Sequence, residues 1–137
     1  MDINYLAVIL CGIVAMVVGA VWYGPLFGKK WMEIIGATDD DVEKRKEMQK
    51  KAMPLYLIQF LLTLGQVYVL GNLIAFTGGN GMGVAFWMWL GFVVPTLAGT
   101  AMWNNNPTRV KRAQFLIQAG YQLIIFIIFG YVMGTWG

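Results

Sequence analysis

Charged and apolar positions are sharply segregated along this chain. Three stretches contain no Asp, Glu, Lys or Arg: residues 3–28, 52–108 and 113–137. A transmembrane helix needs about 20 apolar residues, so the first and last stretches each fit one helix. The middle stretch fits two, because glycine and asparagine interrupt it at residues 77–81. The pattern predicts four membrane-spanning helices, at about 3–27, 54–76, 83–103 and 113–136.

Composition agrees with this pattern. Of 137 residues, 58% are hydrophobic and 12% are charged, whereas soluble domains are about half apolar and a quarter charged. We therefore expect an all-α, integral membrane four-helix bundle formed by a single domain, residues 1–137. Cys11 is the only cysteine and histidine is absent, which excludes an intrachain disulfide and a Cys/His zinc site. No metal or cofactor is expected.

The basic residues predict how the bundle is oriented. Seven of the ten lie in the loop at 28–53 and three in the loop at 104–112. Cytoplasmic loops carry the excess of Lys and Arg, so we expect both loops to be cytoplasmic and both termini to lie outside. The tryptophans favour the interfaces, where an indole ring is stable. Trp22, Trp31 and Trp103 are expected on the cytoplasmic side, and Trp87, Trp89 and Trp136 on the outer side.

The first loop contains a predicted short cytoplasmic helix. Thr38 is a suitable N-cap, and acidic residues precede basic ones through residue 51, in the order that a helix dipole favours. This helix is expected to meet the second span near Pro54. It either sets the topology and solubilises the loop or docks a cytoplasmic partner. In the third loop, Asn106 and Pro107 are expected to form a turn before the fourth span.

The predicted spans contain amides but no Asp, Glu, Lys, Arg or His. This excludes a proton-coupled carboxylate mechanism and leaves no general base, so we expect no enzyme activity. The amides cluster instead on two spans. Gln118, Tyr121 and Gln122 follow Gln114 on the fourth span, and Gln59, Thr63 and Gln66 share one face of the second. These side chains either form a cytoplasm-facing vestibule for a ligand or bond one another between helices.

Small residues recur every four positions on three spans. Cys11, Ala15 and Gly19 lie on the first, Gly91, Pro95 and Gly99 on the third, and Gly130 and Gly134 on the fourth. Such faces allow close backbone approach, within one chain or between two copies that pair through the first or fourth span. Pro95 is expected to bend the third span within the membrane.

The segment from Gly19 to Met32 resembles the domain-of-unknown-function family 1761, a group of small bacterial membrane proteins. The stretches 91–96 and 118–122 are similar to its other motifs. The resemblance implies four spans and the bacterial inner membrane, and it carries no activity. The residues that carry the signature are Trp22, Tyr23, Gly24, Pro25, Lys29, Lys30 and Trp31. They form either a turn where the chain enters the membrane or the rim of a lipid or small-ligand site.

Two functions follow from these patterns. The first is a non-catalytic membrane protein that forms a homo-oligomer or serves as an accessory subunit of a membrane complex. Its expected partners are membrane lipids and membrane proteins, and nucleic acid is not expected. The second is a transporter or channel for a neutral or zwitterionic small solute, which would use the amide-lined vestibule.

Overall fold

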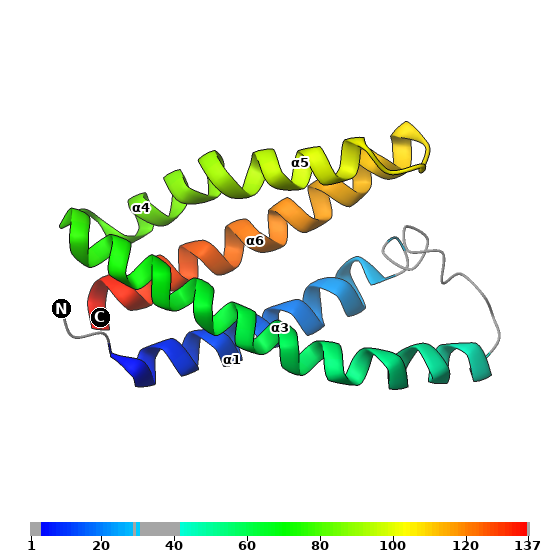
Figure 1. Ribbon diagram of the computed structural model, residues 1–137, viewed down its shortest axis with the longest axis horizontal. Helices are drawn as coiled ribbons and strands as arrows, with labels where there is room; N and C mark the ends of the chain where they lie inside the picture. The colour runs from blue at the N-terminus through cyan, green and yellow to red at the C-terminus, as the bar shows by residue number, and fades with distance from the viewer. Residues whose placement is uncertain (1–3, 29, 31–41, 137) are drawn as a thin grey trace.

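The computed structural model describes residues 4–28, 30 and 42–136, with side chains for all of these except 42–46, 48, 49 and 52. The described residues form helices that run back and forth along one axis (Figure 1). The elements are α1 (Tyr5–Val21), η1 (Trp22–Leu26), α3 (Val42–Thr77), α4 (Gly81–Met88), η2 (Trp89–Val93), α5 (Val94–Met102) and α6 (Thr108–Trp136). Here η1 and η2 are single-turn π-helical segments.

Four of these helical stretches are long and apolar enough to cross a membrane. They are Tyr5–Leu26, Met53–Thr77, Gly81–Met102 and Thr108–Trp136. The predicted all-α bundle with four spans is therefore confirmed. Side chains inside the bundle are the minority on every span, which suits helices whose outer faces meet lipid.

The predicted break at residues 77–81 is a well-formed helix end followed by a helix start. Thr77 ends α3, and Gly78 adopts a φ of 65°, which favours glycine because a Cβ is disfavoured there. The amide of Gly78 donates to the carbonyl of Ile74. Asn80 then caps α4, because its side-chain oxygen accepts from the amides of Met82 and Gly83 at 3.0 and 3.4 Å.

The predicted short cytoplasmic helix is wrong as a separate element. From Val42 the chain is one continuous helix of 36 residues that passes through Pro54 and ends at Thr77. Pro54 and Lys50, whose carbonyl loses its helical hydrogen bond, are both exposed, so water or lipid headgroups can satisfy that carbonyl. The proposed N-cap Thr38 lies outside the described residues.

The fourth span starts earlier than predicted. The helix α6 begins at Thr108, inside the loop expected at 104–112. Only residues 104–107 of that loop form the turn, and the others are the first residues of α6. The carbonyl of Pro107 accepts from the amide of Lys111, and Asn104 closes the turn by donating to Gln114 Oε1 at 2.8 Å. The basic residues after Pro107 are good helix formers, so the helix extends beyond its apolar part.

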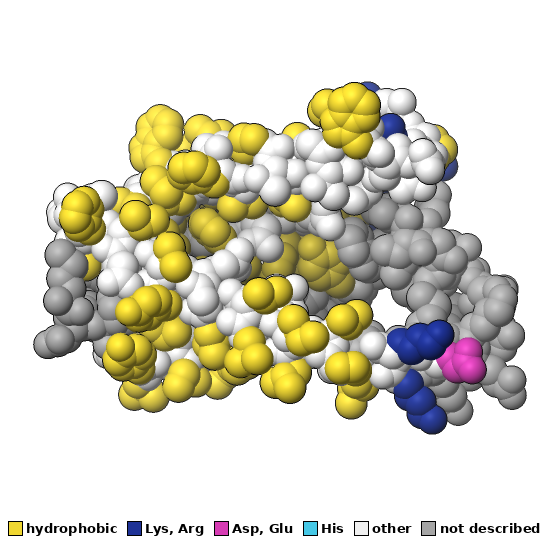
Figure 2. Space-filling view, in the orientation of Figure 1, with side chains coloured by type: hydrophobic (Ala, Val, Ile, Leu, Met, Phe, Trp, Pro, Cys, Tyr) yellow, Lys and Arg dark blue, Asp and Glu magenta, His cyan; other side chains and the backbone are white. Residues whose placement is uncertain are grey.

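The bundle has two chemically different ends. Asn4 Nδ2 donates to the carbonyl of Trp136 at 3.3 Å, so the N-terminal and C-terminal helices end side by side (Figure 1). We call this the terminal end. The turn from Asn104 to Pro107 lies at the opposite end, where the described Lys and Arg side chains also gather (Figure 2). We call that the basic end.

The helix α6 is the central element, because it contacts α1, α3, α4, η2 and α5. Its closest contact is with α4. A Cβ on Gly81 would overlap the carbonyl oxygen of Gly130, and a Cβ on Gly130 would lie 2.8 Å from that of Ala85. The glycines therefore let the two backbones touch near the terminal end.

The small residues of the first span also pack inside the chain. Cys11 and Ala15 are fully buried. A Cβ on Gly19 would lie 3.2 Å from the hydroxyl of Tyr121 on α6. Of the three predicted small-residue faces, those of the first and fourth spans thus serve packing within one chain. On the third span, no described atom lies within 4 Å of a Cβ built on Gly91 or Gly99.

We expect Gly130→Ala to destabilise the bundle by about 1–3 kcal/mol, because the added methyl group overpacks the contact between α4 and α6. Gly99→Ala is the matched control. It adds the same methyl group in open space and improves helix propensity by about 1 kcal/mol. Thermal unfolding in a mild detergent, followed by circular dichroism, measures both. Equal melting temperatures for the two variants would contradict the close contact.

Candidate functional site

Two tryptophans from different spans bind the same short region of α6. Trp22 Nε1 donates to the carbonyl of Ile117 at 2.8 Å, and Trp89 Nε1 donates to the carbonyl of Ala119 at 2.9 Å. In hydrocarbon an indole N–H has no water to bond, so these carbonyls satisfy it. Gly120 makes room for Trp22, because a Cβ there would lie 3.0 Å from the indole ring.

Each of these tryptophans is the first residue of a π-helical segment. Trp22 starts η1 and Trp89 starts η2, and a glycine follows two positions later in both. In η1, Pro25 lacks an N–H, and the amide of Phe27 donates to the carbonyl of Trp22 at 3.1 Å. Gly24 and Pro25, which are predicted to lie in a turn where the chain enters the membrane or at the rim of a ligand site, lie within this π turn. Segments of this kind are often found at functional sites.

Pro95 acts in a similar way on the third span. It lies in the first turn of α5, directly after η2. Pro95 is expected to bend the third span, and the structure has a π turn on its N-terminal side, where proline cannot supply the helical hydrogen bond.

Tyrosines complete the contact around α6. Tyr121 Oη donates to the carbonyl of Ala15 at 2.8 Å, and its ring meets that of Tyr23 edge-on at 5.4 Å. The signature residues Trp22 and Tyr23 and the stretch 118–122 thus lie against each other.

The predicted positions of the tryptophans need one correction. Trp22 is expected on the cytoplasmic side and Trp89 on the outer side, but both indoles are partly buried and bond to carbonyls only two residues apart on α6, so the two do not lie at opposite interfaces. The reason is that α6 offers a carbonyl at that level, whereas sequence distance alone placed Trp89 near the helix end. Trp87, Trp103 and Trp136 are exposed. Lys29 and Trp31 lie outside the described residues.

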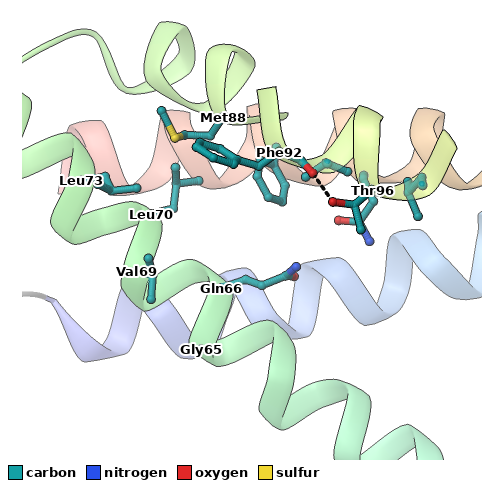
Figure 3. Close-up of a pocket in the computed structure, with 12 residues that line it drawn as sticks. Gly65, Gln66, Val69, Leu70, Leu73, Met88, Phe92 and Thr96 are labelled. Atoms are coloured by element: carbon teal, nitrogen blue, oxygen red, sulfur yellow. Dashed lines mark hydrogen bonds between the residues drawn. The ribbon is translucent and has the colours of Figure 1, made fainter. Parts of the chain in front are cut away.

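A cavity of about 640 Å³ opens between α3, the η2–α5 segment and α6. We call it the amide cavity. In Figure 3 one wall comes from α3, between Gly65 and Leu73, and the facing wall from Met88, Phe92 and Thr96. Three polar side chains line it: Gln66, Thr96 and Gln122. The remaining lining residues are mostly apolar, so the cavity suits an apolar body with a few polar contacts.

The structure brings together two of the six predicted vestibule residues. Gln66 and Gln122 line the amide cavity. Gln59 Nε2 instead donates to Thr63 Oγ1 at 3.3 Å on its own helix, and Thr63 donates to the carbonyl of Gln59. Tyr121 points to span one. The side chains of Gln59 and Gln66 are exposed, although Thr63 between them is buried. Among the described residues, no hydrogen bond joins an amide of α3 to one of α6.

Two amide oxygens on α6 have no donor. Gln118 Oε1 and Gln122 Oε1 are buried and have no hydrogen-bond partner among the described residues. A buried acceptor without a donor costs about 1–3 kcal/mol, so such atoms indicate a bound water, ligand or protein group. Gln122 is the one that lines the amide cavity.

Sequence reasoning did not identify the apolar wall of this cavity. Met88, Phe92 and Val93 line it, together with Thr96, whose hydroxyl donates to the carbonyl of Phe92 at 2.6 Å (Figure 3). The part of the sequence that could have indicated this wall is the stretch 91–96, but its similarity to a family motif does not reveal a cavity.

The sequence also matches the model of one protein family. The model of the family described as "Protein of unknown function (DUF1761)" matches residues 6–134. The chain belongs to this family. Neither the comparison with curated proteins nor that with solved structures finds a match. With its four apolar spans, this member of the family is a multi-pass membrane protein.

We expect Trp22→Phe and Trp89→Phe each to lower the stability of the bundle by about 0.5–1.5 kcal/mol, because each removes one hydrogen bond to α6. Trp87→Phe is the matched control, since that indole is exposed and has no described bond to α6. Melting temperatures in detergent compare the three variants. If Trp87→Phe lowers the melting temperature as much as the other two, the indole bonds do not stabilise the bundle.

Proposed function

We propose that this protein is a non-catalytic membrane protein that self-associates through the face containing the amide cavity. The observation that carries the proposal is a set of polar side chains on this face. Gln59 and Gln66 are exposed on the apolar part of α3, and Gln122 Oε1 has no hydrogen-bond donor in the adjoining cavity. Exposed amides within a span are costly when they face lipid. A protein surface that covers them removes this cost.

A second copy of the chain has the right chemistry to cover this face. An amide carries both donors and acceptors, so the same amide on a second copy is a complementary partner in a twofold arrangement. Gly65 lines the cavity, and no described atom lies within 4 Å of a Cβ built on it. This glycine leaves room for another helix to approach closely.

The face that carries Gly130 is not part of this proposal. Gly130 already contacts α4 within the chain, and the small residues of α1 contact α6 and α3. Self-association through the first or fourth span would have to break these contacts. The exposed side of α3 and α5 needs no such change. A different membrane protein, to which this chain would be an accessory subunit, is the other occupant that the experiment below detects.

A second candidate function uses the same cavity for a small solute. This function is supported by two observations: Gln66 and Gln122 line a mainly apolar cavity, and Gln122 Oε1 has no hydrogen-bond donor there. A neutral or zwitterionic molecule with an N–H or O–H group would satisfy that oxygen. In this case the protein binds or transports the solute as a single chain.

We further propose that the protein lies in the bacterial inner membrane with its basic end in the cytoplasm. The described Lys and Arg side chains (Figure 2) lie at the end opposite both termini (Figure 1). The rule that cytoplasmic loops are rich in Lys and Arg supports this orientation.

Cysteine cross-linking tests self-association. In a Cys11→Ala background, we expect Val69→Cys, on the wall of the amide cavity, to form disulfide-linked dimers in membranes. Ile13→Cys is the matched control. Both positions are exposed and lie eight residues from the terminal end of their helix, about 12 Å at ~1.5 Å per residue. Adding Gln66→Leu to Val69→Cys should weaken the dimer about 3- to 30-fold, as expected for interhelical polar contacts.

Equal cross-linking at the two positions would mean random collision and would contradict self-association. Cross-linking of Val69→Cys to a different protein would indicate an accessory subunit. A monomer whose cavity retains a co-purified small molecule would favour the solute-binding function instead. Mass measurement of the unmodified protein in mild detergent separates these outcomes.

Labelling of single cysteines tests the orientation. In the same Cys11→Ala background, Gly79→Cys lies in the turn at the terminal end and Asn105→Cys in the turn at the basic end, both exposed. We expect a membrane-impermeant maleimide to label Gly79→Cys in intact cells and Asn105→Cys only after permeabilisation. The reverse order of labelling would overturn the proposed orientation.

A further inference from the structure

A second cavity lies at the basic end, between the end of the first span and the first turns of α6. It measures about 620 Å³, and we call it the basic pocket. Lys30 lines it from the first-span side, and Arg109 and Arg112 line it from α6. Among the described residues that line the pocket none is acidic, so its cationic side chains give it a positive potential.

The start of α6 adds to this potential. Its first residue, Thr108, also lines the pocket. The N-terminus of a helix carries a partial positive charge and amide groups without helical partners. Guanidinium groups bind phosphate through paired, parallel hydrogen bonds, which suits Arg109 and Arg112 to that anion.

The rest of the pocket is apolar. Phe27, Leu116 and Ile117 line it, and they range from buried Ile117 to Leu116, which is 60% exposed. A free anion would leave this apolar surface to water. An anionic group that carries a hydrocarbon chain would cover both parts, with charge against the cations and the chain along Phe27 and Leu116.

The pocket is held in shape by contacts already described. Trp22 donates to the carbonyl of Ile117, so the end of the first span is fixed against the α6 wall. Lys111, which lies between the two arginines in sequence, is used elsewhere: its Nζ donates to the carbonyl of Met102 at 2.7 Å. The pocket is therefore lined by Lys30, Arg109 and Arg112, and Lys111 is not among its lining residues.

We propose that the basic pocket binds the phosphate headgroup of an anionic phospholipid. The phosphate lies between Lys30 and the two arginines, and an acyl chain follows the apolar wall. Basic pockets between transmembrane helices at a membrane surface bind such headgroups by the same chemistry. This site is separate from the amide cavity and does not depend on self-association.

Lipid titration of the full chain in mild detergent tests the proposal. Native mass spectrometry counts bound lipid as phosphatidylglycerol or phosphatidylcholine is added. We expect tighter binding of phosphatidylglycerol. Arg112→Gln should weaken that binding about fivefold, the effect of one charge near the surface, and Arg112→Lys should restore only part of it, because lysine keeps the charge but lacks the paired hydrogen bonds. Lys51→Gln is the matched control, because it removes one exposed charge from α3, outside the pocket.

Three results would overturn the proposal. The first is equal binding of the two lipids by the unmodified protein, a comparison that does not depend on any variant folding. The second is an equal loss of phosphatidylglycerol binding in Lys51→Gln and Arg112→Gln, which would show a general charge effect. The third is complete displacement of the lipid by excess inorganic phosphate, which would identify a site for free anions.

Discussion

Contact between α6 and its neighbours is the constraint on which the rest of the structure depends. Within hydrocarbon, water is absent and helices gain nothing from leaving lipid for one another, so close packing and internal hydrogen bonds must hold the spans together. The helix α6 provides both. Gly130 lets α4 touch its backbone, and the carbonyls of Ile117 and Ala119 accept the indole N–H groups of Trp22 and Trp89.

The same contacts position the two cavities. Along α6, the basic pocket uses residues up to Ile117, and the amide cavity begins at Gln122. The two tryptophans bond to α6 at Ile117, the last residue of the basic pocket on this helix, and at Ala119, between the two cavities. Each tryptophan begins a π-helical segment, so the residues after it present a different set of side chains to the bundle than an uninterrupted α-helix would. The two proposed binding functions thus share one structural support.

Much of the fold was predictable from the sequence, and the candidate site was predictable only in part. The break at 77–81 was recognisable because glycine and asparagine have strong local preferences. The amides were recognisable by type, yet only Gln66 and Gln122 share a cavity, because Gln59 bonds within its own helix. Trp89 was placed at an interface because sequence distance does not show which carbonyl a neighbouring helix offers. The continuity of α3 through Pro54 was also not predictable, because proline usually breaks or kinks a helix. It is tolerated where the carbonyl that it leaves without a partner reaches solvent.

The sequence by itself determined that this protein has four apolar helices joined by basic and glycine-rich connections. The physical reason is that hydrocarbon excludes charge and that a spanning helix has a fixed minimum length. Only the tertiary structure decided which faces of those helices meet. A helix of uniform hydrophobicity carries little information about its own rotation, so the pairing of Gly81 with Gly130 and of Trp22 with Ile117 depends on steric fit and on the position of single hydrogen bonds.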